Sequence, residues 1–302
     1  MKGYQHPKYA MSFREIGIPI KLPNSKGFIL KRNIPDFPYY DGMGCYPFFV
    51  CQDWEKLPQD INELKDKLIC IYLVTDPFGN YNEEILRYCF PDVMYLFKKH
   101  YVIYLDQPKE KYICYHHRRY ARKALKCIKV EECERPLDFL EDWVRLYNNL
   151  VKRHNIKGIT KFSKKTFQYQ LEVPGIIAFR ALYKNQTVGM LLWYIQNEVG
   201  YYHLGAFSDI GYEKRASFAL FWYAIDYFSY KKLKWLNLGG GAGIDSNGSE
   251  GLKRFKKGWS NDSRNTYFCG RIFDYKKYYD IIKKKNILDN HFFPLYRKGE
   301  FE

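Results

Sequence analysis

The sequence contains no CxxC pair, no long apolar run and no G-x-x-x-x-G-K-[ST] phosphate loop. Its eight cysteines are irregularly spaced, which argues against a zinc site and against a disulfide framework. No run approaches the ~18 apolar residues that a membrane-spanning helix needs, and the opening stretch MKGYQHPKYAMSFREIGIPI lacks the apolar core of a signal peptide. We therefore expect a cytoplasmic protein with no metal site and no transmembrane segment, whereas peripheral contact with a membrane stays open.

The composition is that of a folded and strongly basic protein. Of the 302 residues, 46% are apolar and 19% are aromatic, which is enough to form packed cores. The 49 Lys and Arg residues outnumber the 33 Asp and Glu residues, so the formal charge is +16. Such an excess favours anionic partners, such as nucleotide phosphates, RNA, acidic glycans or a membrane surface. A general bias of the composition toward Lys and Tyr would produce the same excess without any such partner.

The first hundred residues alternate between predicted helices and predicted strands. Residues 60–68 and 82–90 have helical patterns, whereas 69–75 and 101–106 are rich in strand-forming residues. This alternation indicates a small α/β unit. At YICYHHRRYARKALKC (112–127) the pattern changes to a strongly cationic helix. We place the domain boundary just before that helix, which gives predicted domains at 1–111 and 112–302.

The second half is predicted to contain a strand meander followed by a helix and a further strand. Short turns join the three predicted strands of the meander, at 175–184, 187–196 and 199–208. The other predicted elements are an amphipathic helix at 136–155, an apolar helix within 209–232, a strand at 233–240, a short helix near 249–257 and a strand near 266–273.

The segment KWLNLGGGAGIDSNGSEGLKRFKKGW (234–259) is the most unusual part of the sequence. Three glycines directly follow a predicted strand, although glycine loses the most conformational entropy on folding and has no side chain to pack. In α/β folds, ligands bind beyond the carboxyl ends of strands, where such glycines keep the approach clear. Four cations follow on one short helix: Lys253, Arg254, Lys256 and Lys257. The glycines lack the G-x-G-x-x-G frame of a dinucleotide site.

Four stretches resemble the GNAT acyltransferase superfamily and, within it, the Fem-type branch: YHHRRYARKALK (115–126), VPGIIAFRALYKNQTVGMLLWY (173–194), YYHLGAFSDIGYEKRASFALFWYAI (201–225) and NLGGG…GLKRFKKGWS (237–260). That branch includes peptidoglycan bridge-forming peptidyltransferases, which use aminoacyl-tRNA, and related acetyltransferase-like domains. The resemblance implies an α/β (α+β) fold with two GNAT-like domains, each a mostly antiparallel mixed sheet flanked by helices. It implies that the second domain is complete and that the first is degenerate.

In the superfamily an acyl donor lies between two central strands that part, and its phosphates lie at the start of the next helix. By resemblance, Lys256 is expected to stabilise charge on the reacting carbonyl, with Phe255 beside it to exclude water. The expected donor-binding residues are Phe207, Ser208, Gly211, Lys214, Arg215, Ala216 and Ser217. The expected acceptor-binding residues are Tyr202, His203, Gly239, Gly240, Gly241 and Arg254.

Each of these assignments has a structural alternative. The four cations near 256 would also suit the solvent face of a helix, and residues 208–217 would also suit an ordinary capped helix start. The basic helix at 115–126 would either bind a nucleotide-linked small molecule, tRNA or another polyanion, or present a solvated face. No general base is assigned, because Asp245 and Glu250 fit turn and helix-start roles and His203 fits a packed histidine. Water would then relay the proton.

The sequence therefore predicts an N-acyltransferase that moves an acyl group from acyl-CoA, such as acetyl-CoA, to an amine of a sugar or cell-envelope precursor. The second half shows no long charged helical hairpin that would grip tRNA, which favours acyl-CoA as the donor. An aminoacyl-tRNA-dependent peptidyltransferase acting on a peptidoglycan precursor is one alternative. A non-catalytic GNAT-like module that binds a polyanion is another.

Overall fold

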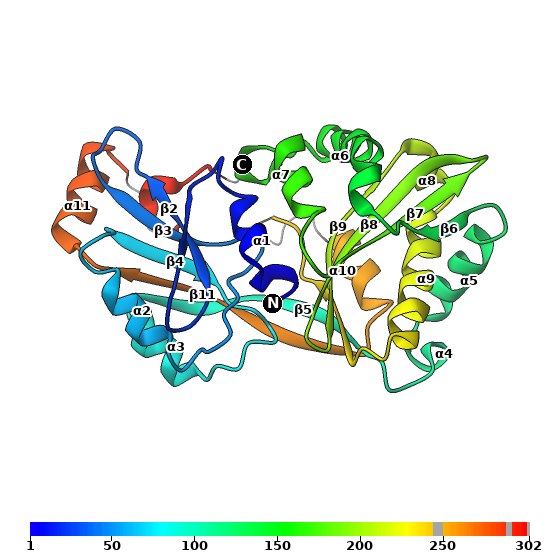
Figure 1. The fold of residues 1–302 in the computed structure, drawn as a ribbon, viewed down its shortest axis with the longest axis horizontal. Helices are drawn as coiled ribbons and strands as arrows, with labels where there is room; N and C mark the ends of the chain where they lie inside the picture. Colours follow the sequence, from blue (N-terminus) through cyan, green and yellow to red (C-terminus); the bar gives the residue numbers. More distant parts are fainter. Residues whose placement is uncertain (244–249, 288–291, 301–302) are drawn as a thin grey trace. The chain divides into compact units, whose positions relative to one another are not determined.

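A computed structural model describes residues 1–243, 250–287 and 292–300 (Figure 1). Contacts between residues divide the chain into two compact units. Unit 1 comprises Met1–Gly3 and Lys99–Arg264, and unit 2 comprises Tyr4–Lys98 and Asn265–Glu302.

Unit 1 is built on a mixed sheet. Its strands are, in order of pairing, β5 (Val93–Tyr104, from Lys99 onward), β10 (Trp235–Gly239), β9 (Val199–Phe207), β8 (Gln186–Gln196), β7 (Ile176–Tyr183) and β6 (Lys129–Glu132). β9 and β10 are parallel, whereas the other adjacent pairs of this sheet are antiparallel. The turn between β7 and β8 consists of Lys184 and Asn185, with φ values of 49° and 61°. Positive φ at both positions is what a two-residue hairpin turn requires.

Helices cover both faces of the unit 1 sheet. On one face, α5 (Tyr115–Ala124) and α9 (Ala216–Tyr230) share an apolar core with strand residues such as Trp193 and Leu236. On the other face lie α6 (Leu140–His154) and α7 (Lys164–Gln170), where the hydroxyl of Tyr194 donates to the carbonyl of Gln170. Trp193 and Tyr194 point to opposite faces because side chains alternate along a strand. The short helices of unit 1 are α4 (Lys109–Tyr112), α8 (Asp209–Glu213) and α10 (Glu250–Lys257).

The strands of unit 2 also pair in a mixed, mostly antiparallel pattern. Its strands are β1 (Ile18–Lys21), β2 (Phe28–Asn33), β3 (Tyr40–Gly44), β4 (Cys70–Val74) and β11 (Asp262–Ile272, from Asn265 onward). β3 and β4 are parallel, and the pairs β1–β2, β2–β3 and β4–β11 are antiparallel. The helices are α1 (Pro7–Met11), α2 (Leu57–Glu63), α3 (Glu83–Cys89) and α11 (Tyr275–Lys284).

The two units share one order of strand directions. In each, three consecutive antiparallel strands lead through a helical connection to a strand parallel to the third, and an antiparallel strand follows it in the sheet. The predicted fold class, mostly antiparallel mixed sheets flanked by helices, is thereby confirmed. Unit 1 carries the longer strands and the longer connecting helix.

The boundary between the units differs from the predicted domains 1–111 and 112–302. The last strand of each sheet comes from a distant part of the chain. Tyr101 to Tyr104 pair with β10 in unit 1, and Phe268 to Ile272 pair with β4 in unit 2. Residues 99–111 therefore belong to unit 1, and residues 265–302 belong to unit 2. A single cut along the sequence cannot describe such an exchange.

A buried ionic cluster fixes the C-terminal segment within unit 2. Arg297 forms a bidentate ion pair with Asp41 on β3, with Nε–Oδ2 and Nη2–Oδ1 distances of 2.8 and 3.1 Å. Arg32 on β2 and Arg297 each donate to Glu300 at 2.8 Å. Arg297 is 4% exposed and Asp41 is fully buried, so each charge depends on its partner for compensation.

We expect the substitution Arg297→Met to lower the free energy of unfolding by about 3–5 kcal/mol, because it leaves the Asp41 carboxylate buried without its counter-charge. Denaturant unfolding followed by circular dichroism measures the change. Lys283→Met, at an exposed position of α11, is the matched control and should change stability by less than about 0.5 kcal/mol. Equal stabilities of the two variants would contradict the role given to the cluster.

Candidate functional site

The two parallel strands of unit 1 are paired only near their beginnings. Trp235, Leu236 and Asn237 of β10 lie opposite Val199, Gly200 and Tyr201 of β9. β9 then continues to Phe207, whereas β10 ends at Gly239, after an irregularity in its pairing with β5. The strands therefore part beyond Tyr201, as the resemblance to the superfamily implies for the strands on either side of an acyl donor.

The turn of the chain at the end of β10 explains the first of the three glycines, Gly239. Gly239 has a φ of +76°, a conformation that favours glycine, and a Cβ there would lie 3.1 Å from Nζ of Lys256. The side chain of Asn237 holds the turn, because its Oδ1 accepts from the amide of Gly239 at 2.9 Å. The ring of His100 contacts the same oxygen at 3.1 Å through Nδ1. The sequence analysis missed Asn237 and His100, although a buried asparagine just before a glycine loop was a usable signal.

Lys256 differs from the cations around it. Its side chain is only 7% exposed, and its Nζ donates to the carbonyl of Gly240 at 2.6 Å. The same nitrogen lies 5.7 Å from the ring centroid of Tyr202 on β9. By contrast, Arg254 and Lys257 are exposed, and Lys253 forms an ion pair with Glu250. The alternative of a uniform solvent face is therefore wrong for Lys256.

Phe255 anchors the helix that carries Lys256. Its ring packs against Phe218 and Phe221 of α9 at centroid distances of 5.2 and 5.1 Å, and the fully buried Trp259 lies behind it. Phe255 is expected to exclude water beside Lys256, and these contacts show that it also has a packing role. Phe255 faces the core of unit 1 and so holds α10 in place while Lys256 reaches the end of β10.

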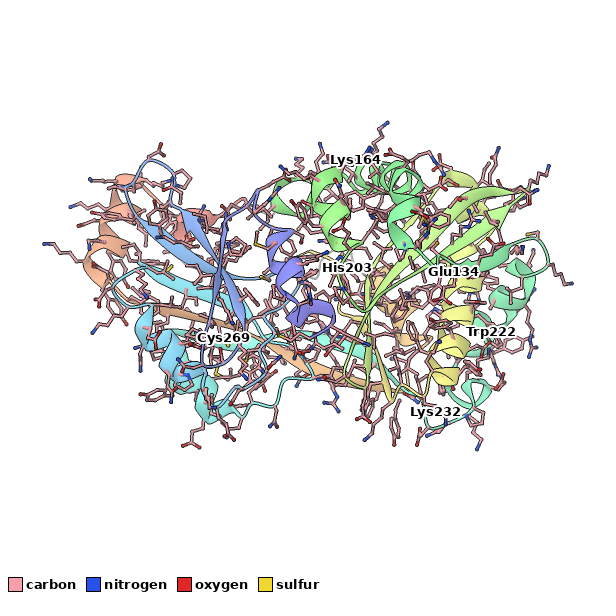
Figure 2. The ribbon with its side chains drawn as sticks, viewed as in Figure 1. Glu134, Lys164, His203, Trp222, Lys232 and Cys269 are labelled. Carbon is pink, nitrogen blue, oxygen red and sulfur yellow. The ribbon has the colours of Figure 1, made fainter. Side chains whose placement is uncertain are left out.

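Tyr202 and His203, both expected at the acceptor site, point to opposite faces of β9. The ring of Tyr202 lies 5.3 Å from that of Trp193 and 5.0 Å from that of Phe221, on the face that α9 covers. His203, which is labelled in Figure 2, faces α7, where its Nε2 lies 3.1 Å from Oε1 of Gln170. Burial lowers the pKa of His203 to about 3, so the ring is neutral at pH 7. The structure thus brings Tyr202, Gly239, Gly240 and Lys256 together and leaves His203 on the other face.

The segment expected to bind the acyl donor, residues 207–217, is helical over much of its length. Ser208 caps α8, with its Oγ accepting from the amide of Gly211 at 3.1 Å. Gly211 is required by packing, since a Cβ there would lie 2.1 Å from the carbonyl oxygen of Val188. Packing against β8 is thus sufficient reason for a glycine at this position. The backbone carbonyl of Phe207 is also hydrogen-bonded, because it accepts from the side chain of Asn149 of α6 at 2.7 Å.

The start of α9 is the part of this segment that keeps the expected geometry. Arg215 precedes the helix in a left-handed conformation, with φ 59°, and its guanidinium lies 3.9 Å from the ring centroid of Tyr120. The amides of Lys214 and Arg215 donate to carbonyls within α8, at Ile210 and Tyr212. The amides that begin α9, those of Ala216 and Ser217, are the ones that point out of a helix start. Lys214 itself is paired with Glu213.

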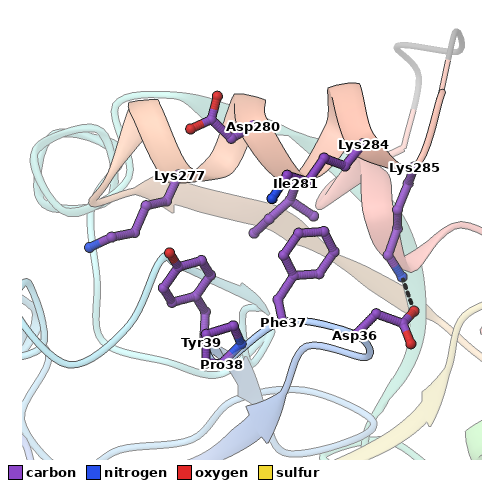
Figure 3. A pocket seen from close by; sticks show the side chains of 9 residues that line it. All are labelled: Asp36, Phe37, Pro38, Tyr39, Lys277, Asp280, Ile281, Lys284 and Lys285. Carbon is purple, nitrogen blue, oxygen red and sulfur yellow. Dashed lines mark ion pairs between the residues drawn. The ribbon is translucent and has the colours of Figure 1, made fainter.

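Two pockets lie elsewhere on the described residues. One, in unit 1, lies where α6 meets the start of α8 and is lined in part by Arg145, Asn149, Lys152 and Ser208. The other, in unit 2, lies between α11 and the loop that carries Phe37 and Tyr39 (Figure 3). Ser208 is the one candidate residue among their lining residues, and Lys256 lines neither pocket.

Of the two other acidic candidates, Glu250 lies within the described residues. Glu250 is exposed and its pKa is lowered by the hydrogen bond from Lys253, which suits a helix-start residue. Asp245 lies outside the described residues. Within the described ranges, no three His, Cys, Asp or Glu side chains are grouped as a metal ion would require. No helix there has the length and apolar character needed to cross a bilayer.

Comparison with known proteins identifies the fold. No protein-family model matches the sequence, and neither does any curated protein. Among solved structures, FemX is 16% identical, with a TM-score of 0.68 over 93% of this chain and 95% of that chain. The C-terminal domain of a putative lysylphosphatidylglycerol synthetase from Agrobacterium fabrum is 12% identical, with a TM-score of 0.66 over 95% and 92% of the two chains. L-PGS from Bacillus licheniformis is 14% identical, with a TM-score of 0.60 over 90% and 93%.

These likenesses extend over nearly the whole chain, and at such low identities they concern the fold. The predicted resemblance is confirmed at that level: the chain has the fold found in FemX and in the lysylphosphatidylglycerol synthetase domain.

The buried His203 gives a prediction about pH. The folded protein holds this ring neutral down to a pKa of about 3, whereas the unfolded chain protonates it below about pH 6.5. Between these values the unfolded state binds one more proton, so acidification destabilises the fold through His203 by roughly 1.4 kcal/mol per pH unit.

We therefore expect His203→Gln, which keeps an amide beside Gln170, to lose less stability than the wild type between pH 6.5 and pH 4.5. Urea unfolding of both proteins across that range measures the difference. Other acid-sensitive groups are the same in both chains and cancel in the comparison. Parallel stability curves would show that His203 is not held neutral.

Proposed function

We propose that this protein is an acyltransferase of GNAT type, which transfers an acyl group from a carrier to an amine. The observation that carries the proposal is the parting of β9 and β10, together with the buried ammonium of Lys256 at the end of β10. The fold shared with FemX supports it, since the same arrangement of sheets is present over nearly the whole chain.

In the proposed reaction the acceptor amine attacks the carbonyl of the acyl donor. A C–N bond forms, the bond from the carbonyl carbon to the carrier breaks, and the carrier leaves as a thiolate when the donor is acyl-CoA. Negative charge develops on the carbonyl oxygen, and Lys256 stabilises it in surroundings where an ammonium acts more strongly than in water. The bond from Nζ to the carbonyl of Gly240 holds this ammonium at the end of β10.

The proton of the amine goes to water in this proposal. The neutral ring of His203 faces the other side of β9, and Glu250 is an exposed, ion-paired residue of α10. Neither is placed to take a proton at the end of β10, beside Lys256. Tyr202 is given no part in proton transfer, because burial raises its pKa and keeps its hydroxyl protonated at pH 7. Its ring contributes to the shape of the site.

We propose acyl-CoA, in particular acetyl-CoA, as the donor, with its phosphates at the start of α9. The amides of Ala216 and Ser217 and the charge of Arg215 would receive them, because helix starts attract anions. The acceptor is proposed to be an amine of a sugar or cell-envelope precursor, and the site of action is proposed to be the cytoplasm. An aminoacyl-tRNA donor is the second candidate, which the net charge of +16 favours.

A third candidate is a module that binds a polyanion without catalysis. The exposed cations of α5 support it: Arg119, Arg122, Lys123 and the nearby Lys126 lie on its solvent side. The opposite side of α5 packs against α9 through Ala121 and Ala124. Binding by such a face would weaken steeply as salt is added.

We expect Lys256→Met to lower kcat by about 10²–10³-fold, because one donor to the developing oxyanion is lost. The rate is measured with acyl-CoA donors and an amine acceptor, and circular dichroism checks that the variant is folded. Lys257→Met removes an exposed cation from the neighbouring position of the same helix and should keep wild-type turnover. If Lys256→Met turned over as fast as Lys257→Met, Lys256 would have no part in the reaction.

We expect acetyl-CoA or a longer acyl-CoA to raise the melting temperature, since a ligand at 100 times its Kd adds about 2.7 kcal/mol of stability. Differential scanning fluorimetry with acyl-CoAs, aminoacyl-tRNA and a synthetic polyanion at two salt concentrations compares the three candidates. Stabilisation by charged tRNA alone would support the second candidate. Stabilisation by any polyanion, lost at high salt and without acyl transfer, would support the third.

A further inference from the structure

His117 links the basic helix α5 to the helix that carries Lys256. Its Nε2 lies 2.9 Å from the carbonyl oxygen of Phe255, the residue just before Lys256. A carbonyl only accepts, so Nε2 carries the proton and donates. The other ring nitrogen, Nδ1, lies 3.0 Å from Sγ of Cys114, and in this tautomer it accepts from the thiol. Both nitrogens of a side chain that is 6% exposed are thus occupied.

The bond from His117 completes the end of α10. The last four carbonyls of a helix have no partner within the helix and need donors from elsewhere. In α10, the carbonyls of Arg254, Lys256 and Lys257 accept from the backbone amides of Gly258, Trp259 and Ser260. The carbonyl of Phe255 accepts from the ring of His117 instead.

The side chains around His117 pack closely against its ring. Its centroid lies 5.1, 5.4 and 4.9 Å from those of Phe218, Phe255 and Trp259. Gly258 leaves room for it, since a Cβ at that position would lie 2.3 Å from Cε1 of the ring. Burial lowers the pKa of His117, which keeps the ring neutral at pH 7.

We propose that His117 is a positioning residue that fixes the last turn of α10 and, through it, the place of the Lys256 ammonium at the end of β10. The carbonyl of Phe255 selects the tautomer with the proton on Nε2, and the thiol of Cys114 helps to hold the ring by its bond to Nδ1. A second contact supports the same junction, because the amide of Cys114 donates to the carbonyl of Gly258 at 3.0 Å. The consequence for turnover rests on the proposed function, whereas the placement of Lys256 does not.

Two readouts test the proposal on the full chain. The first is chemical labelling of lysines with N-hydroxysuccinimidyl acetate, followed by peptide mass spectrometry. In the wild type, the buried Lys256 should react much more slowly than the exposed Lys257. We expect His117→Leu, which removes the donor, to speed the labelling of Lys256 and to leave that of Lys257 unchanged. His117→Gln, whose amide can still donate to Phe255, should restore protection.

The second readout is the split between kcat and KM. Because a displacement of about 1 Å can cost about 100-fold in rate, His117→Leu should lower kcat by that order and leave the KM for the donor near that of the wild type. His117→Gln should recover most of the rate. His116→Leu, at the exposed neighbouring position, is the matched control and should behave as the wild type in both readouts.

Protection of Lys256 in His117→Leu equal to that in the wild type would overturn the proposal, even for a protein without any transferase activity. Absence of turnover in the wild type with every donor would count against the proposed function alone, since the labelling readout still applies. If His117→Leu does not fold, Cys114→Ala and Cys114→Ser take its place. Faster labelling of Lys256 in the alanine variant, with protection kept in the serine variant, supports the proposal, and equal protection in both contradicts it.

Discussion

The hydrogen bond from Lys256 to the carbonyl of Gly240 is the contact on which the candidate site depends. It joins the end of β10 to α10 across the segment that connects them. Two features make it available. The left-handed turn at Gly239 ends the strand, and the burial of Phe255 and Trp259 sets the orientation of the helix. A short helix of eight residues gains little stability of its own, so these tertiary contacts are what keep it in one position.

Unit 2 has the same strand pattern as unit 1, but in unit 2 the gap between the two parallel strands is filled. β3 and β4 are paired at two positions, Gly42 with Ile71 and Met43 with Tyr72. The pairing then resumes beyond the end of β3, where Phe49 bridges to Thr75 and its amide donates to the carbonyl of Val74 at 2.7 Å. A fully buried phenylalanine thus lies where unit 1 has parting strands. The two units therefore differ at the corresponding place in their strand patterns by this phenylalanine and its backbone pairing.

Local patterns in the sequence are sufficient to predict the helices and strands. They are not sufficient to predict which side chains become buried and which face of the sheet these side chains occupy. The meander, the helix at 216–230 and the short helix at 250–257 follow from periodicity and turn residues, because these signals act over a few positions. The burial of Lys256 beside the exposed Lys257 depends on how α10 docks, which no local pattern encodes. The same holds for His203, since the face to which a strand residue points is decided by the sheet and the helices around it. Local signals also leave the reason for Gly211 open, and the structure shows that packing against Val188 requires a glycine there.

The discontinuous make-up of unit 2 has a consequence for how the protein is made. Unit 1 can assemble once the ribosome has produced Arg264, because all of its strands precede that point. Unit 2 must wait for β11, α11 and the arginine that holds Asp41, so its earlier strands emerge without their final partner. During translation the amino-terminal half is therefore the later of the two to mature, and until then it exposes an unpaired strand edge of the kind that chaperones protect.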